Sequence, residues 1–301
     1  MLKRLRRLLA YHFVYYGARL LMAIAGALPR QAGRVFFGWL GALAYLVLSK
    51  SRRIAHANLR FTYGTAFPDK EIRRIALGSF AHLGRCGYDF ARMGQLGPER
   101  LKKMVTVTGL DNVSTAIARG RGVVVITGHV GNWELLAAYL VSAGYRVSVL
   151  ATKMKDVRLD RLVTDLRRRT GLVVLERSRG LKEALLALRR GEILGLLVDQ
   201  DTAVDSVIVD FLGKPAKTAV GVVKLAAHTG AAIVPMAALA ADDGTYRIDI
   251  REPVAISGNG AMLAEDVERC SKAVEDFITA EPAQWVWMHK RWKSVVPDIY
   301  S

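Results

Sequence analysis

The stretch GHVGNWEL at residues 128–135 places a histidine and a carboxylate at the seam between two expected elements. It follows an apolar run, GVVVIT, that is typical of a buried strand, and it opens the helical pattern LLAAYLVSAGY. His129 and Glu134 are five residues apart, so their side chains would not share one face of a single helix. We therefore predict that His129 lies in the turn before the helix. Gly131 would allow that turn to fold the ring back over Glu134.

A histidine beside a carboxylate can act as a general base with an orienting partner. In this prediction Glu134 fixes the tautomer of His129 and leaves the second ring nitrogen free to take a proton. The amides of Gly131 and Asn132, at the start of the helix, are expected to bind an oxyanion or a phosphate. These groups together suit acyl transfer, in which the histidine deprotonates a hydroxyl that attacks a thioester. The competing interpretation is a histidine that merely caps the helix beside a solvated glutamate.

From residue 104 onward the sequence alternates between strand and helix patterns. The expected strands are 105–109, 122–127, 146–151, 172–176, 193–199 and 232–239 with an edge strand at 246–256, and the expected helices are 135–145, 157–171, 178–191, 218–231 and 262–279. This alternation predicts an α/β fold with a mainly parallel sheet flanked by helices. Ligands bind such sheets at the carboxyl ends of the strands, which is where GHVGNWEL stands.

The bulk composition limits the chemistry. The chain has 301 residues and is 51% hydrophobic, which provides for a large core. Its two cysteines, Cys86 and Cys270, are far apart and typical of reduced thiols. Four aspartates, at positions 199, 201, 205 and 210, have a spacing that fits no coordination loop. No metal and no cofactor is therefore expected.

The net charge of +17 is unevenly distributed along the chain. Residues 1–68 contain no Asp or Glu, and two apolar runs at 8–29 and 35–48 stand among their Lys and Arg residues. We expect residues 1–60 to form a membrane-associating helical region and residues 61–301 to form the α/β domain. Arg19 interrupts the first run, so this helix would lie in the interface or span the membrane with Arg19 inward, unless the front is a core hairpin. The basic cluster Lys3–Arg7 predicts a cytoplasmic start.

Four collinear stretches resemble one family. HVGNWE resembles the H-x4-D/E motif of lysophospholipid acyltransferase-like enzymes and is close to the HxGNWE form of the lipid A biosynthesis (lauroyl/myristoyl-type) acyltransferases. RRIAHANLRFTYGTAFP, LVDQDTAVDSVIVDFLGKPAKTAVGVVKLAAHTGAAIVP and PAQWVWMHKRWK resemble further blocks of that family.

The resemblance implies an enzyme at the cytoplasmic face of the inner membrane. Its partners would be acyl carrier protein or acyl-coenzyme A as donor, a phosphorylated glycolipid as acceptor and an anionic membrane surface. His129 would be the base and Glu134 its partner.

The sequence also departs from related enzymes, and it offers secondary candidates. The E-G-T-R block of glycerol-phosphate acyltransferases is absent, which argues against a simple glycerophosphate acceptor. An ornithine lipid, a phosphatidylinositol mannoside or a lysophospholipid stay open as other acceptors. Arg168, in a run of three arginines, could bind a substrate phosphate or simply suit the helix dipole. The resemblance implies that Asp199, at the end of the expected strand 193–199, is a structural or substrate-orienting acid.

A nucleic-acid-binding protein is the alternative from another class. The charge of +17 and the tail that interleaves Trp285, Trp287 and Trp292 with Lys and Arg would suit stacking on bases. That alternative does not explain the acid-free apolar runs or the position of HVGNWE after a strand. We therefore expect no nucleic-acid partner, and we predict that the tail packs over the core and at the membrane interface.

Overall fold

The computed structural model describes residues 2–257 and 262–301, with side chains from residue 11 onward, so the basic cluster Lys3–Arg7 lies outside the described side chains. Within these residues, one large sheet contains β1 (Val105–Thr108), β2 (Val123–Thr127), β3 (Val147–Ala151), β4 (Val173–Glu176), β5 (Ile193–Leu197), β8 (Ala232–Ala240) and β9 (Tyr246–Ile250). A separate hairpin consists of β6 (Ser206–Phe211) and β7 (Lys214–Ala219).

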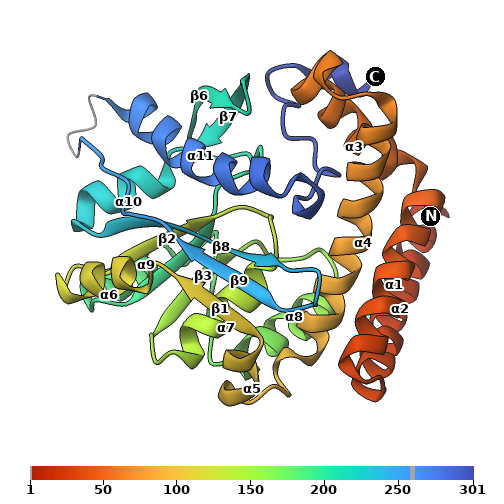
Figure 1. Ribbon diagram of the computed structural model, residues 1–301, viewed down its shortest axis with the longest axis horizontal. Helices are drawn as coiled ribbons and strands as arrows, with labels where there is room; N and C mark the ends of the chain where they lie inside the picture. The colour runs from red at the N-terminus through yellow and green to blue at the C-terminus, as the bar shows by residue number, and fades with distance from the viewer. Residues whose placement is uncertain (1, 258–261) are drawn as a thin grey trace.

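Helices surround the sheet on both faces and at one end (Figure 1). They are α1 (Leu2–Ala27), α2 (Arg30–Val47), α3 (Ser49–Tyr63), α4 (Asp69–Met93), α5 (Pro98–Lys103), α6 (Leu110–Ala118), α7 (Trp133–Ser142), α8 (Val157–Arg169), α9 (Leu181–Arg189), α10 (Gly221–Thr229) and α11 (Leu263–Ala280). Short 3₁₀ turns occur at Gly64–Ala66, Pro282–Gln284 and Pro297–Tyr300.

The strand order is β1-β9-β8-β2-β5-β3-β4, and every neighbouring pair is parallel except β8 with β9. This confirms the predicted α/β fold with a mainly parallel sheet. The predicted edge strand at 246–256 is wrong in its position, because β1 pairs with β9 on one side while β8 pairs with it on the other. The predicted helix at 218–231 also begins too early. Its first residues belong to β7, which follows a tight turn at Gly213 with φ +74°.

The core has one layer on each face of the sheet. Every residue of β2 is buried, as expected for a strand that helices cover on both sides. Val124 and Ile126 pack with α9, α10 and α11, whereas Val123 and Val125 pack with α6 and α7. Alternate side chains of β2 thus pack against opposite helical layers, and the sheet lies between these layers with the carboxyl ends of its strands at one edge.

The helical front, α1 to α3, packs on α4 at one end of the sheet (Figure 1). Helices α2 and α4 approach closely through glycines: a Cβ on Gly41 would lie 2.2 Å from the carbonyl oxygen of Phe80, and one on Gly84 would lie 2.1 Å from that of Phe37. The predicted division between residues 60 and 61 falls within α3 and stays a prediction.

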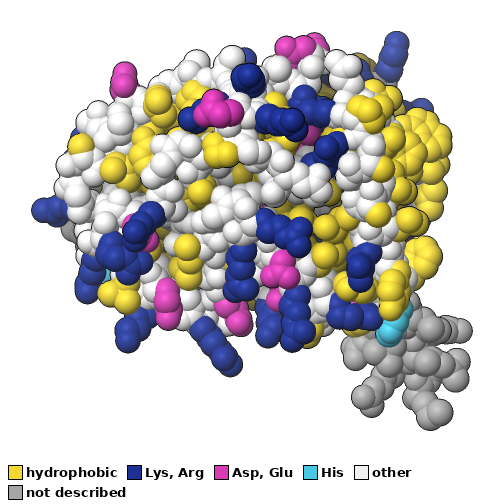
Figure 2. Space-filling view, turned by 90° about the horizontal axis from the view of Figure 1, so that it is seen from below, with side chains coloured by type: hydrophobic (Ala, Val, Ile, Leu, Met, Phe, Trp, Pro, Cys, Tyr) yellow, Lys and Arg dark blue, Asp and Glu magenta, His cyan; other side chains and the backbone are white. Residues whose placement is uncertain are grey.

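The front also presents apolar side chains to solvent. We call this surface the apolar front; it consists of Phe13, Val14, Tyr16 and Leu20 on α1 and Val35, Trp39, Leu43, Leu46 and Val47 on α2. Figure 2 shows hydrophobic side chains gathered on that side of the molecule. Among the described residues no single helix has the length and apolar composition of a membrane span. Helix α2 and the helical segment 49–66 have the required length and apolar composition only when taken together, and they are bent by 89° relative to each other.

Candidate active site

His129 meets an aspartate at the carboxyl edge of the sheet. It lies two residues after β2, and Asp199 lies two residues after the adjacent β5, with Thr127 and Leu197 in register. Parallel strands in register end at the same edge, so the two side chains are brought together. The Nδ1 atom of His129 is 2.8 Å from Oδ1 of Asp199, and the backbone amide of His129 donates to Oδ2 at 2.6 Å.

Asp199 is buried, and its surroundings hold it ionised. Besides the two bonds from His129, the indole Nε1 of Trp285 donates to its Oδ2 at 2.7 Å. Burial acts to raise the pKa of the Asp199 carboxyl, but the attraction of His129 and the hydrogen bonds from His129 and Trp285 outweigh burial, and the pKa falls to about 2. A carboxylate only accepts hydrogen bonds, so the neutral imidazole carries its proton on Nδ1.

The other ring nitrogen of His129 faces the space in front of the sheet. Within the described residues Nε2 has no hydrogen-bond partner, and the side chain is 23% exposed. Its ring packs edge-on against Trp133, with 5.1 Å between the ring centroids. Nε2 therefore has a free lone pair in an accessible position, which a general base requires.

Glu134 has a different partner from the one predicted. Its carboxylate receives three hydrogen bonds from Arg167, one from Nη2 to Oε1 at 2.6 Å and two from Nε, to Oε2 at 3.0 Å and to Oε1 at 3.2 Å. No hydrogen bond joins Glu134 to His129 in the described part of the chain, so the predicted contact between them is wrong. Asp199 orients the ring instead, because α7 begins at Trp133 and its first turn aims Glu134 toward the end of α8.

Arg167 faces the cavity, whereas the predicted substrate-binding residue Arg168 does not. Arg167 lines the same cavity as His129 and Glu134, whereas Arg168 is exposed and does not line it. Successive residues of a helix point about 100° apart, so only one arginine of the run can face the cavity. Burial acts to lower the pKa of Arg167, but the hydrogen bonds and charge of Glu134 outweigh it and raise that pKa.

Gly131 and Asn132 build the turn, and their amides do not point to a ligand. The amide of Gly131 donates to the carbonyl of Gln284 at 3.0 Å, and that of Asn132 donates to Ala238 at 2.8 Å. The predicted oxyanion or phosphate site at these two amides is therefore wrong. Gly131 has φ +61°, and a Cβ there would lie 2.1 Å from the carbonyl oxygen of Ala238. Position 131 therefore needs glycine, because a side chain would clash with the backbone of β8 and strain the positive φ.

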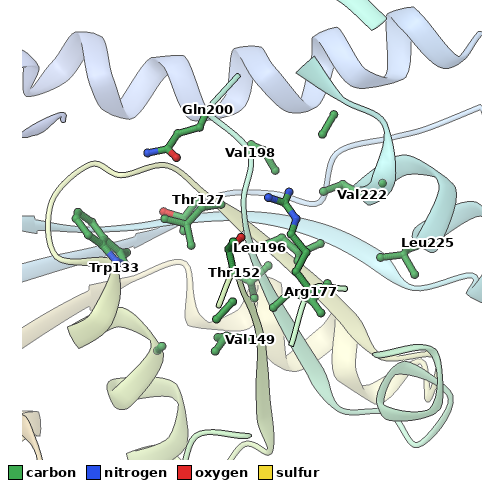
Figure 3. A pocket seen from close by; sticks show the side chains of 18 of the residues that line it. Thr127, Trp133, Val149, Thr152, Arg177, Leu196, Val198, Gln200, Val222 and Leu225 are labelled. Atoms are coloured by element: carbon green, nitrogen blue, oxygen red, sulfur yellow. The ribbon is translucent and has the colours of Figure 1, made fainter. Parts of the chain in front are cut away.

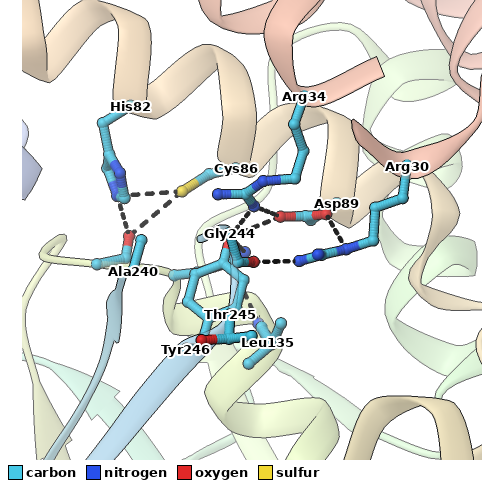
Figure 4. Close-up of polar contacts among 12 residues, drawn as sticks. Arg30, Arg34, His82, Cys86, Asp89, Leu135, Ala240, Gly244, Thr245 and Tyr246 are labelled. Atoms are coloured by element: carbon cyan, nitrogen blue, oxygen red, sulfur yellow. Dashed lines mark hydrogen bonds and ion pairs between the residues drawn. The ribbon is translucent and has the colours of Figure 1, made fainter. Parts of the chain in front are cut away.

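The side chain of Asn132 caps α7 and connects it to a buried polar network. Its Oδ1 accepts from the amide of Leu135 at 3.0 Å, as N-cap residues do, and its Nδ2 donates to the hydroxyl of Tyr246 at 3.2 Å. That hydroxyl donates to Asp89 of α4 at 2.6 Å and accepts from Arg34 of α2 at 2.7 Å, while Arg34 also pairs with Asp89 (Figure 4). The helical front is thereby bonded to the start of the α7 helix.

A second contact from α4 reaches the same turn. Nε2 of His82 lies 3.0 Å from the carbonyl oxygen of Gly131, and the thiol of Cys86 lies 3.4 Å from it. Burial lowers the pKa of His82 to about 4, so its ring is neutral at pH 7 and donates to this carbonyl. Burial also raises the pKa of the Cys86 thiol, which keeps it protonated. These groups hold the turn and do not face the cavity.

In front of His129 lies a cavity of about 840 Å³, within the range of about 300–1,000 Å³ of pockets that bury small ligands. Its walls are mostly aliphatic side chains from β3, β5, α7, α9 and α10, such as Val149, Leu196, Val222 and Leu225 (Figure 3). The polar groups converge at the carboxyl edge of the sheet. A long apolar chain can occupy such a space while one polar end stays beside His129.

The tryptophans of the C-terminal tail are core residues. Trp285, Trp287 and Trp292 are at most 2% exposed, which confirms the predicted packing but not the predicted position at an interface. Buried rings cannot stack on bases, so the feature that favoured nucleic-acid binding has a structural explanation. Two site residues are not predicted as such from the sequence: Arg167, in a run of which Arg168 is preferred, and Trp285, which is expected only to pack over the core and at the interface. The arginine run and the QWVW stretch were the available signals for them.

Residues 2–294 match the model of the family described as bacterial lipid A biosynthesis acyltransferase. The chain belongs to this family and is an acyltransferase, as the motifs predicted.

Among similar proteins, a lipid A biosynthesis acyltransferase of Haemophilus influenzae is 25% identical over 258 residues, covering 83% of this chain and 77% of the relative. A lipid A biosynthesis lauroyltransferase of Escherichia coli is 27% identical over 263 residues, 85% of this chain and 83% of the relative. A phosphatidylinositol mannoside acyltransferase of Mycobacterium tuberculosis is 27% identical over 224 residues, which cover 72% of this chain and 70% of the relative.

One solved structure, of a 1-acyl-sn-glycerophosphate acyltransferase from Thermotoga maritima, aligns over 85% of this chain and 99% of its own with a TM-score of 0.40 and 16% identity.

Proposed function

We propose that this acyltransferase moves a fatty acyl chain from a thioester donor to a hydroxyl of a phosphorylated glycolipid, with His129 as the general base. The observation that carries the proposal is the bond between His129 and buried Asp199 at an apolar cavity. Nε2 of His129 takes the hydroxyl proton as the oxygen attacks the thioester carbonyl. When the carbon–sulfur bond breaks, the imidazolium returns the proton to the leaving thiolate.

Asp199 contributes by stabilising the imidazolium that forms during this step. Its ionised carboxylate, held by Trp285 and by the amide of His129, keeps the ring in one orientation and one tautomer. Because Asp199 touches the ring and not the substrate, we propose it as a positioning residue. The predicted catalytic role of Glu134 changes accordingly: we propose that Glu134 acts through Arg167, which it holds against the cavity wall.

Two acceptor classes fit the family. The lipid A acyltransferases among the relatives favour a lipid A precursor-like acceptor, and the mannoside acyltransferase favours a phosphatidylinositol mannoside. Both are glycolipids that carry phosphate and a free hydroxyl. We propose the lipid A precursor-like glycolipid first and keep the mannoside as the alternative, with acyl carrier protein or coenzyme A carrying the donor thioester.

We also propose that the apolar front binds the cytoplasmic face of the inner membrane. Val35 and Trp39 are 73% and 62% exposed, one turn apart on α2, and residues 1–68 carry no acid. Exposed apolar side chains beside cations suit an anionic bilayer surface. Val35→Glu with Trp39→Glu should weaken binding to anionic phospholipid vesicles at least about tenfold. The matched control is Val173→Glu on β4, which should bind as the unaltered protein does, and equal binding by all three proteins would contradict the proposal.

Acyl transfer itself is tested with purified protein, an acyl thioester and each glycolipid, with products read by mass spectrometry. We expect one added acyl chain on one acceptor and loss of that product in His129→Ala. His228→Ala is the matched control, because His228 lines the same cavity but has no contact with Asp199. Full activity in His129→Ala would end the assignment of the base, and no product from either glycolipid would end the proposed acceptor class.

A further inference from the structure

One arginine that lines the cavity, Arg177, has no counter-ion among the residues that the structure describes. Among the described charged residues that line the cavity, Glu134 pairs with Arg167, and Asp205 pairs with Lys224 at 2.5 Å. Arg177 also lines the cavity, yet its guanidinium has no hydrogen bond or ion pair within the described residues. Arg177 is exposed to solvent at the edge of the cavity, where its guanidinium offers several donors in a planar arrangement that matches a phosphate.

The backbone fixes Arg177 at this place. It directly follows β4, and its amide donates to the carbonyl of Ala151 at the end of β3, with a distance of 2.9 Å. The turn then closes with a hydrogen bond from the amide of Gly180 to the carbonyl of Glu176 at 2.6 Å. Figure 3 shows the side chain extending into the cavity among Leu196, Val198 and Val222. Its position thus comes from the sheet, as that of His129 does.

The strand order sets how far Arg177 stands from the reacting centre. The strands run β2-β5-β3-β4, so three strand intervals separate the end of β2, which carries His129, from the end of β4. At about 4.8 Å per interval, the two side chains start about 14 Å apart along the same edge. A ligand that spans them would place its reacting group at His129 and an anionic group at Arg177.

The surrounding charge favours an anion at this end. Residues 152–182, which run from the end of β3 to the start of α9, contain ten Lys or Arg and four Asp or Glu. Of these cations, Arg167 and Arg177 line the cavity, and an excess of positive charge in the adjoining segment attracts anionic ligands. Both substrates of the proposed function carry a phosphate: the donor on its pantetheine arm, when acyl carrier protein or coenzyme A delivers it, and the acceptor on its sugar or lipid part.

We propose that Arg177 is a phosphate-binding subsite of the active-site cavity, holding a substrate phosphate away from His129 while the ester forms at His129. This inference rests on the proposed function and adds to it the anchoring of one substrate. Arg177 contacts the phosphate and not the reacting atoms. It therefore governs substrate affinity and not the chemical step.

The test compares Arg177→Gln with Arg179→Gln; Arg179 is two residues away and is also exposed, but it does not line the cavity. Each protein receives donors on 4′-phosphopantetheine or on pantetheine, and acceptors with or without phosphate. We expect Arg177→Gln to raise KM for one phosphate-bearing substrate about tenfold to a hundredfold with kcat nearly unchanged. The phosphate-free version of that substrate should show no difference, and Arg179→Gln should behave as the unaltered protein.

The arm that responds identifies the source of the phosphate. An effect confined to 4′-phosphopantetheine donors assigns the subsite to the donor, and one confined to phosphorylated acceptors assigns it to the acceptor. Equal KM changes with and without phosphate, or no change in any arm, would overturn the proposal.

Calorimetric binding of 4′-phosphopantetheine and of the phosphorylated glycolipid, each without its reaction partner, needs no turnover. A loss of binding in Arg177→Gln therefore supports the subsite even where acyl transfer fails. Equal binding to both variants counts against it.

Discussion

The imidazole of His129 and the carboxylate of Asp199 are joined by a hydrogen bond of 2.8 Å across 70 residues of sequence. The bond exists because β2 and β5 are neighbours in the sheet and end in register. Asp199 is buried and Nε2 of His129 is not hydrogen-bonded to described residues, so the pair is directed outward to the cavity. The chemistry of the site depends on this relationship.

Asp199→Asn should lower kcat by about two to four orders of magnitude, the usual contribution of acid–base catalysis, with little change in KM. An amide at this position cannot stabilise the imidazolium and can hold the ring in the wrong tautomer. Steady-state kinetics with a circular dichroism check of folding measures this. Asp201→Asn is the matched control: Asp201 is equally buried but accepts from Ser294, so its loss should affect stability and leave kcat within about tenfold. Equal kcat losses in the two variants would contradict the assignment.

Glu134 and Arg167 should behave as one unit. If Glu134 acts by holding Arg167, then Glu134→Gln and Arg167→Gln each impair the reaction, and the double variant is no worse than the more impaired single variant. We expect losses in kcat/KM of about ten- to a hundredfold for each single variant, because each removes a charge-assisted pair. The measurement is kcat/KM for the four proteins of the cycle. Losses that simply multiply in the double variant would show that the two residues act separately.

Tyr246→Phe should destabilise the protein by about 1–3 kcal/mol, because the substitution removes a hydroxyl that serves three buried polar groups. Arg34, Asp89 and Asn132 would each lose one hydrogen bond. Guanidinium-induced unfolding measures the difference. Tyr145→Phe is the control, since the Tyr145 hydroxyl makes no hydrogen bond within the described residues, and it should change the unfolding free energy by less than about 0.5 kcal/mol. A loss of the same size in both variants would mean that the network contributes little.

The stability of the fold should decrease as the pH falls from about 6.5 to about 4. Burial lowers the pKa of His82 to about 4 in the folded protein, whereas an unfolded histidine titrates near 6.5. Below pH 6.5 the unfolded chain binds a proton that the folded His82 does not bind, which favours unfolding by up to on the order of 3 kcal/mol at pH 4. Above pH 6.5 His82 is neutral in both the folded and the unfolded chain, so its titration does not lower the stability there. Unfolding curves between pH 7.5 and 4.5 measure the slope, which should be shallower in His82→Gln; an unchanged slope would exclude His82 as its source.

Some of the site could be predicted because its signals are local. His129 is recognised by its residue type, by the glycine two residues later and by its place after an apolar strand. The strands and helices of the sheet were found from hydrophobic periodicity, which the chain carries wherever it lies. The family resemblance rested on four blocks whose order along the chain is itself part of the sequence. None of these inferences requires knowing which strands are neighbours.

The tertiary structure was needed to identify Asp199 as the partner of His129 and Arg167 as the arginine that faces the cavity. Asp199 reaches the ring only because β5 pairs with β2, and the hydrophobic periodicity of a strand does not indicate which strands are its neighbours. Arg167 faces the cavity and Arg168 does not because packing fixes the rotation of α8 about its axis. The amides of Gly131 and Asn132 are taken by Gln284 and Ala238, which are distant in sequence. The sequence alone thus determined the class of fold and pointed to His129 as the candidate base, since both follow from local residue patterns. The structure decided which groups surround the base, since those contacts depend on how distant segments pack.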